Sequence, residues 1–215
     1  LVDSKRDPSP KIDFYERTKI ERRDLSVMVL LDVSGSTDEM SGGQRILDIE
    51  TQAALIFGEG LMSLGDRFSI CGFSSNGRQN CRYFVYKDFH DDWDSQAVGR
   101  LFSAVPSSST RIGAALRHAG SKLRREVTRR MLIILVTDGR PMDQGYDPET
   151  RYAQHDVRMA CEENRKAGIH TFCVSTMENS RADMEIMFPE RKFVILKDIT
   201  ELPRILPRLY IHLTT

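Results

Sequence analysis

Two long apolar segments constrain what this chain can fold into. They are Leu25–Leu31 (LSVMVLL) and Met131–Thr137 (MLIILVT), and both are rich in residues that favour β-strands. Apolar residues at successive positions, rather than at every second position, are typical of a strand that is buried on both faces. Such strands form the centre of a largely parallel sheet, which needs helices on both sides. We therefore expect an α/β fold.

The rest of the chain supplies the other strands and the helices of such a fold. Strand-like composition recurs in four further segments: 67–74, 81–87, 169–175 and 192–196. Helical spacing is found in six segments: 46–64, 94–104, 112–123, 149–167, 181–187 and 200–215. Asn76-Gly77 is typical of a hairpin turn, so one strand is expected to be antiparallel, at the sheet edge. We predict a doubly wound, Rossmann-like, mostly parallel six-stranded sheet with helices on both faces.

Composition excludes some classes of function. The chain has 31 Lys and Arg against 31 Asp and Glu, a formal net charge of zero. This balance argues against a nucleic-acid binder, because affinity for phosphate backbones rests on a clustered excess of cations. No segment approaches the ~20 apolar residues of a transmembrane helix, so no membrane insertion is expected. The four cysteines show no metal-binding spacing, and we expect reduced thiols.

The beginning of the chain differs from the rest. Residues 1–24 are mostly charged and polar and contain Pro8 and Pro10, so we expect a lead-in arm or linker, followed by one domain over residues 25–215. The chain lacks an N-terminal Met and any signal peptide, which suggests a piece of a longer cytoplasmic protein.

Oxygen-bearing side chains follow the two central strands. Asp32, Ser34 and Ser36 come directly after the first strand, Asp138 follows the fourth, and Thr110 ends a Ser-rich loop before a helix. If the first and fourth strands are neighbours, these residues converge at the carboxyl edge of the sheet, where ligands of such folds bind. Two carboxylates and three hydroxyls suit Mg²⁺, with Mn²⁺ or Ca²⁺ as alternatives. Asp-x-Ser alone is equally typical of a turn or a helix N-cap, but the combination favours a metal site.

A metal ion at this place would change what the site can bind. Two facing carboxylates repel each other without a cation, and a divalent ion removes that penalty. A coordination position open to solvent could then accept an Asp or Glu carboxylate of a partner. Three neighbouring residues are candidate partner contacts: Arg111, Met142 and Asp143. Arg111 could pair with the incoming carboxylate, and a structural salt bridge is the alternative.

These motifs resemble a known family. Asp32-x-Ser34-x-Ser36, Thr110 and Thr137-Asp138-Gly139 are similar to the metal-ion-dependent adhesion site (MIDAS) of von Willebrand factor A domains, and the resemblance spans about Asp24 to Thr215. It implies that Ser34, Ser36 and Thr110 bind the metal directly or through water. Asp32 and Asp138 would lie in or just behind the first coordination shell.

A narrower resemblance is to the C-terminal domains of CbbO and NorD proteins. It rests on five segments: Gly65-Asp66-Arg67-Phe68, Gly72-Phe73-Ser74-Ser75, Lys87-Asp88-Phe89, residues 109–119 and the ending from Leu202-Pro203 to Leu209-Tyr210. This family implies an adaptor that works with a MoxR-type AAA+ ATPase hexamer. In CbbO the ATPase is CbbQ and the client is Rubisco, which suggests its large subunit and an association with carboxysomes; NorD assists nitric oxide reductase.

We therefore expect a noncatalytic adaptor whose Mg²⁺ binds an acidic residue of a client, with the Rubisco activase preferred and the nitric oxide reductase adaptor as the alternative. A Mg²⁺-dependent phosphoryl-transfer enzyme with Asp32 as nucleophile is a remote alternative. An enzyme resembling the haloacid dehalogenases would need an acid where Ser34 stands, and the chain has no nucleotide-binding glycine motif. A structural domain with a disused site is the third alternative.

Overall fold

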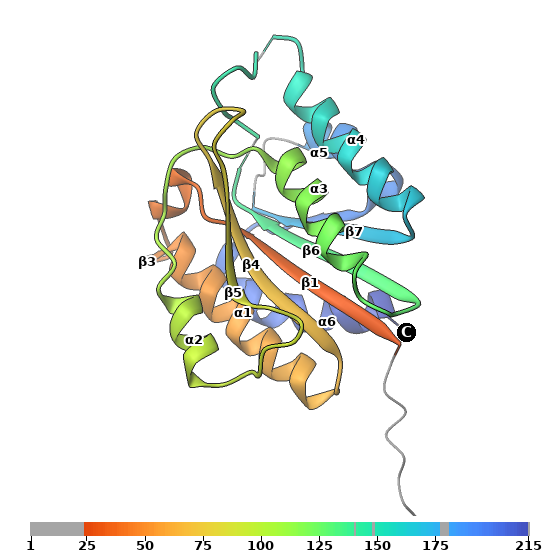
Figure 1. The fold of residues 1–215 in the computed structure, drawn as a ribbon. Coiled ribbons are helices and arrows are strands. Elements are labelled where there is room, and N and C mark those ends of the chain that lie inside the picture. The colour runs from red at the N-terminus through yellow and green to blue at the C-terminus, as the bar shows by residue number, and fades with distance from the viewer. Residues whose placement is uncertain (1–23, 140, 148, 177–180, 215) are drawn as a thin grey trace, which may run out of the picture.

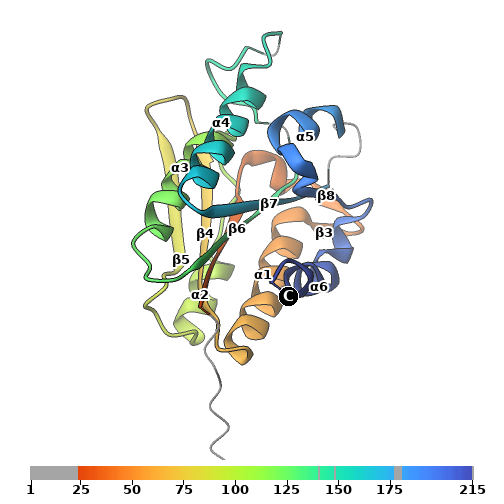
Figure 2. The ribbon, with the colours of Figure 1, turned by 90° about the vertical axis from the view of Figure 1, so that its right-hand side faces the viewer.

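The computed structural model describes residues 24–139, 141–147, 149–176 and 181–214. The expected lead-in arm therefore lies outside the described residues, apart from Asp24, and the division of the chain at residue 24 stays a prediction. Within the described part, most segments belong to a six-stranded sheet and the helices that cover it, and a separate two-stranded hairpin lies at residues 40–45 (Figures 1 and 2).

The central sheet has six strands in the order β5-β4-β1-β6-β7-β8. Their bounds are Leu25–Asp32 (β1), Arg67–Ser75 (β4), Cys81–Lys87 (β5), Arg130–Thr137 (β6), Ile169–Ser175 (β7) and Phe193–Ile195 (β8). β5 is antiparallel to β4 and lies at the edge, whereas the other neighbours are parallel. The predicted fold class is confirmed, including the adjacency of the first and fourth predicted strands, which are β1 and β6.

Helices cover both faces of the sheet. On one face lie α1 (Ile46–Ser63), α2 (Ser95–Phe102) and α6 (Leu202–Thr214), and on the other lie α3 (Ile112–Leu123), α4 (Tyr152–Lys166) and α5 (Arg181–Met187) (Figure 1). Short 3-10 turns lie at Gly35–Asp38 (η1), Pro189–Arg191 (η3) and Ile199–Glu201 (η4). Among the described residues, no helix has the length and apolar character that a membrane crossing needs.

The apolar runs of the central strands are explained by two hydrophobic cores. In β1, Val27 and Val29 belong to the core under α1 and α6, whereas Met28 and Leu30 belong to the core under α3 and α4. Every residue of β1 is buried, which accounts for the missing alternation. The strand ends at Asp32, so a carboxylate follows the core at the carboxyl edge of the sheet.

Two local features differ from the prediction. A small hairpin that was not predicted joins η1 to α1; it consists of β2 (Met40–Ser41) and β3 (Gln44–Arg45). In addition, α4 begins at Tyr152 and not at residue 149. The carboxylate of Asp147 accepts a hydrogen bond from the backbone N–H of Glu149, which holds this segment in a turn. Of the four free cysteines, Cys71 and Cys173 are buried, whereas Cys81 is exposed.

Candidate metal centre

Asp32 is held rigidly where β1 meets β6. The strand register pairs Leu31 with Val136, so Asp32 lies beside Thr137. The Thr137 hydroxyl donates a 2.8 Å hydrogen bond to Asp32 Oδ2, and the backbone N–H of Ser34 donates a 3.0 Å bond to Asp32 Oδ1. Asp32 is fully buried. Its carboxylate therefore forms the floor of the site, fixed from both sides.

Ser34, Ser36 and Asp138 extend this arrangement toward solvent. The hydroxyl oxygens of Ser34 and Ser36 lie 3.1 Å apart, and the Ser36 hydroxyl donates a 3.1 Å hydrogen bond to Asp138 Oδ1. Ser34 is buried, whereas Ser36 is exposed and Asp138 is half-buried. The loop after β1 thus places successive oxygen atoms between the buried Asp32 carboxylate and the surface.

The Thr110 loop closes the site from the other side. The Thr110 hydroxyl donates a 3.3 Å hydrogen bond to Asp32 Oδ1. The backbone N–H of Gly35 donates to the carbonyl of Ser108 at 2.9 Å, and a Cβ at position 35 would lie only 3.2 Å from that carbonyl oxygen. Glycine therefore allows the two loops to approach closely.

The structure brings all five predicted metal residues into one hydrogen-bonded group. We call this group, made of Asp32, Ser34, Ser36, Thr110 and Asp138, the oxygen cluster. Whether these residues bind a metal is a separate question, which the chemistry of the donors addresses.

Among the described residues, no positive charge acts on the two carboxylates of the oxygen cluster. Burial raises the pKa of Asp32 to about 7; the charge of Asp138 adds to this rise, and hydrogen bonds from Ser34 and Thr137 oppose it. Burial also raises the pKa of Asp138, against the hydrogen bond from Ser36. The charges acting on the two groups, Asp138 on Asp32 and Glu39 on Asp138, are both negative. One buried and one half-buried carboxylate in this state favour the uptake of either a proton or a cation.

The donor set fits a hard divalent cation. It consists of carboxylate and hydroxyl oxygens only, which suits Mg²⁺ and Mn²⁺ better than softer metals. The described residues contain no group of three or more His, Cys, Asp or Glu side chains placed to hold a metal. The ion would accordingly be held by few carboxylates together with hydroxyls and water, as is usual for Mg²⁺.

The three candidate partner contacts occupy different environments. Arg111 Nε donates a 2.7 Å hydrogen bond to Asp143 Oδ2, and the side chains of both residues are nearly or fully buried. The structural salt bridge, the alternative for Arg111, is therefore formed. Met142 is 70% exposed, and its carbonyl accepts a 2.8 Å hydrogen bond from the backbone N–H of Thr110. A contact with a partner stays a prediction, and Met142 is the residue best exposed for it.

Sequence reasoning missed two residues near the oxygen cluster. Thr137 belongs to the Thr137-Asp138-Gly139 motif, but the hydrogen bond from its hydroxyl to Asp32 was not predicted. Glu50 of α1 is fully buried, and within the described part of the chain neither of its carboxylate oxygens has a hydrogen-bond partner. Its position next to Ile49 and near Ala53 of the apolar stripe is a signal that could have revealed it.

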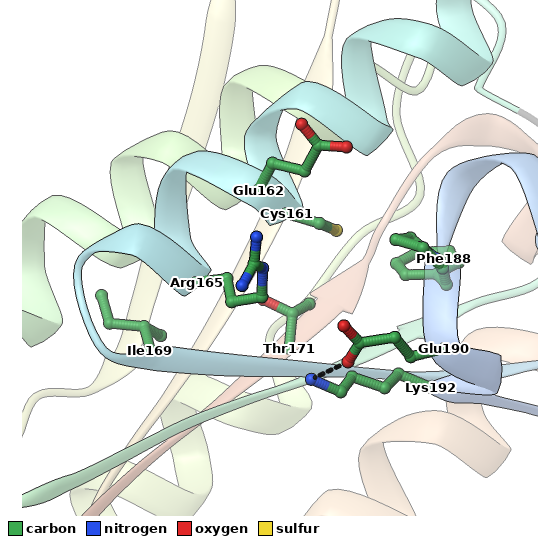
Figure 3. Close-up of a pocket in the computed structure, with 9 residues that line it drawn as sticks. Cys161, Glu162, Arg165, Ile169, Thr171, Phe188, Glu190 and Lys192 are labelled. Atoms are coloured by element: carbon green, nitrogen blue, oxygen red, sulfur yellow. Dashed lines mark ion pairs between the residues drawn. The ribbon is translucent and has the colours of Figure 1, made fainter.

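A second hollow lies far from the oxygen cluster, between α4, the first half of β7 and η3 (Figure 3). Its cavity volume is about 30 Å³, and Glu190 and Lys192 form a 2.9 Å ion pair at its edge. This volume is on the order of one or two water molecules. The hollow therefore offers no room for an organic ligand.

Comparisons with known proteins agree on the type of domain. The profile of the von Willebrand factor type A domain matches residues 26–208. Protein NorD of Brucella suis biovar 1 is 35% identical over 190 residues, which is 88% of this chain and 30% of that protein. Protein NorD of Stutzerimonas stutzeri is 36% identical over 178 residues, 82% of this chain and 29% of that protein. The uncharacterized protein PA0525 of Pseudomonas aeruginosa is 35% identical over 211 residues, which is 97% of this chain and 34% of that protein.

The chain thus spans about a third of the length of these relatives. Among solved structures, the von Willebrand factor type A protein of Catenulispora acidiphila has a TM-score of 0.62 at 16% identity, covering 87% of this chain and 42% of its own. The pilus adhesin SpaC of Lactobacillus rhamnosus GG has a TM-score of 0.69 at 13% identity, and the match covers 90% of this chain and 31% of SpaC. These structures support the fold alone. Because the family profile matches most of this chain, residues 26–208, the chain belongs to the von Willebrand factor type A domain family.

Proposed function

We propose that this domain is a metal-dependent docking module, in which the oxygen cluster holds Mg²⁺ and the ion binds an acidic side chain of a client protein. The supporting observation is the pair of carboxylates, the buried Asp32 and the half-buried Asp138, which have no positively charged partner among the described residues and are surrounded by hydroxyls. Bound there, the ion would supply the charge that accepts a carboxylate oxygen. Ser36 and Asp138 face the more exposed side, where a client would approach.

The rim of the oxygen cluster supports a protein as the binding partner. Met142 is 70% exposed and Met40 is 68% exposed. Both are attached to the loops of the site, because Met142 accepts the hydrogen bond from Thr110 and Met40 follows η1. Methionine side chains are flexible and adapt to apolar surfaces. The client surface in this proposal is an Asp or Glu flanked by apolar residues.

The relatives favour a NorD-like assignment. The preferred expectation, a CbbO-like Rubisco activase, is not confirmed, since the relatives described above are named NorD or uncharacterized. We therefore propose the alternative, a cytoplasmic adaptor in the maturation or activation of nitric oxide reductase. A MoxR-type AAA+ ATPase hexamer is the proposed partner. Such an assembly would strengthen a weak carboxylate contact through a high effective concentration.

The geometry disfavours a phosphoryl-transfer enzyme. Asp32 would be the nucleophile, but it is fully buried. Its Oδ1 accepts bonds from Ser34 and Thr110, and its Oδ2 accepts a bond from Thr137. A nucleophilic oxygen needs access to the phosphorus atom, which this packing denies. We expect no phosphatase activity with Mg²⁺. Phosphatase turnover by this chain that disappears in Asp32→Asn would contradict the proposal of a noncatalytic adaptor.

The docking proposal is tested in cells that depend on the full-length protein for nitric oxide reductase activity. Ser34→Ala removes a proposed ligand and should abolish the activation. Ser63→Ala is the control, because this serine is exposed at the far end of α1 and its hydroxyl donates to the carbonyl of Glu59. Full nitric oxide reductase activity with Ser34→Ala, at equal protein level, would contradict the proposal.

A further inference from the structure

We infer that Glu50 is a third carboxylate of the metal centre, which strengthens cation binding from behind the oxygen cluster without contacting the ion. This inference rests on the proposed function, because it assigns a role toward the same metal. Glu50 belongs to α1 and is outside the five-residue motif that the sequence indicated.

The burial of Glu50 requires an explanation. The residue lies in the second turn of α1, on the face that also buries Ala53, Ala54 and Phe57 against the sheet. It is 0% exposed, and neither Oε1 nor Oε2 has a hydrogen-bond partner among the described residues. A buried carboxyl without a partner is costly, and native proteins rarely keep one unless water or an ion satisfies it.

The electrostatic surroundings of Glu50 point to a cation. After burial itself, the charges of Asp138 and Asp32 are what raise its pKa well above the ordinary value. The carboxyl groups of Asp32 and Asp138 are therefore close enough to act on Glu50, and their negative charges disfavour its ionised state. Glu50 and Asp32 are fully buried, and Asp138 is half-buried. A divalent ion in the oxygen cluster would instead favour the ionised state of Glu50, because its positive charge attracts all three carboxylates.

Glu50 is not proposed as a direct ligand. The described residues contain no three acidic side chains placed to hold one metal, so the third carboxylate acts at longer range or through water. Residues in such a supporting position commonly change metal affinity by about 10- to 100-fold when they are replaced.

The test measures Mg²⁺ affinity by isothermal titration calorimetry on the 215-residue chain and on Glu50→Gln, which removes the charge and keeps the shape. We expect an affinity about tenfold lower or more for Glu50→Gln. The control is Glu59→Gln on the same helix, about 13 Å farther along its axis. Glu59 is exposed and accepts a 2.8 Å bond from Trp93 Nε1, which Gln can still accept, so its Mg²⁺ affinity should be unchanged.

The outcomes separate this inference from the proposed function. Equal Mg²⁺ affinity of wild type and folded Glu50→Gln would overturn the inference and leave the docking proposal intact. A wild-type chain that binds no Mg²⁺ would overturn both. Glu50→Asp keeps the charge and provides a second variant, whose affinity should lie above that of Glu50→Gln; an affinity as low as that of Glu50→Gln would contradict the electrostatic role.

Discussion

Arg111 Nε and Asp143 Oδ2 are 2.7 Å apart, in an ion pair that follows directly after Thr110 of the oxygen cluster. The guanidinium also lies 4.1 Å from the ring centre of Tyr146, and Asp143 Oδ1 accepts a 2.8 Å bond from the backbone N–H of Gly77. The pair thus ties the Thr110 loop to the loop after β6 and to the β4–β5 hairpin. We interpret it as the brace that positions Thr110.

Breaking this pair should destabilise the fold and weaken metal binding. Asp143→Asn leaves a buried guanidinium without its counter-charge, which costs about 3 kcal/mol of unfolding free energy. Urea denaturation measures this loss, and titration with Mg²⁺ should show reduced affinity. Glu162→Gln is the matched control, because its partner Arg158 is exposed and Glu162 is only half-buried, so this pair should contribute less than about 1 kcal/mol. Equal losses in the two variants would rule out the brace.

The Thr137 hydroxyl should matter more for metal affinity than for stability. Thr137→Val removes the 2.8 Å hydrogen bond to Asp32 Oδ2 and keeps the volume of the side chain. We expect a loss of about 1 kcal/mol in stability. Because Asp32 is then less firmly oriented, Mg²⁺ affinity should fall by about tenfold. Calorimetric titration that gives the wild-type affinity would show that this bond is structural only.

The metal-free domain should lose stability as the pH rises toward 7. Burial, together with the charge of Asp138, raises the pKa of Asp32 from 3.8 to about 7. The folded state therefore holds a proton between pH 4 and pH 7 that the unfolded state has released, so the fold is favoured at low pH. In EDTA, the melting temperature should be lower at pH 7.5 than at pH 5. Asp32→Asn should reduce this difference, and an unchanged difference would contradict the assignment.

Saturating Mg²⁺ should reverse this loss at pH 7.5. Metal binding requires the ionised carboxylates, so it becomes tighter with rising pH and releases protons. Free ion at a hundred times the dissociation constant stabilises the fold by about 2.7 kcal/mol. Thermal melts with and without Mg²⁺ measure the gain. The absence of any shift with Mg²⁺, Mn²⁺ or Ca²⁺ would argue against a metal site.

The close packing of α3 on α4 gives a prediction about stability alone. A Cβ at Gly120 would collide with the side-chain amide of Asn164, whose Nδ2 donates a 3.1 Å bond to the carbonyl of Leu116. Gly120→Ala should therefore cost about 1–3 kcal/mol. Gly60→Ala in α1 is the control, since no atom lies within 4 Å of its added Cβ and alanine favours the helix. Chemical denaturation should show opposite signs for the two variants.

Much of the fold could be predicted because its signals are local. The apolar runs of β1 and β6 and the stripe of α1 each follow from burial on a known face. The Gly42-Gly43 turn of the β2–β3 hairpin was a similar local signal, and both glycines have positive φ, but the hairpin was overlooked because its strands have two residues each. Asp32, Ser34, Ser36 and Asp138 could be predicted because parallel strands bring their carboxyl ends together, and Thr110 because its loop was expected at the same edge.

The remaining features depend on tertiary contacts that no sequence spacing shows. Arg111 meets Asp143 only because the Thr110 loop pairs with Met142. Glu50 is buried because α1 packs on the face of β1 opposite to α3. Side chains that act across two elements in this way require the structure itself.

The most direct test of metal-dependent docking measures binding of this chain to purified nitric oxide reductase and to purified Rubisco from the same organism, in Mg²⁺ and in EDTA. We expect binding to nitric oxide reductase in Mg²⁺ that is lost in EDTA and in Ser34→Ala, and retained in Ser63→Ala. Binding to nitric oxide reductase that persists in EDTA, or binding to Rubisco alone, would contradict this expectation.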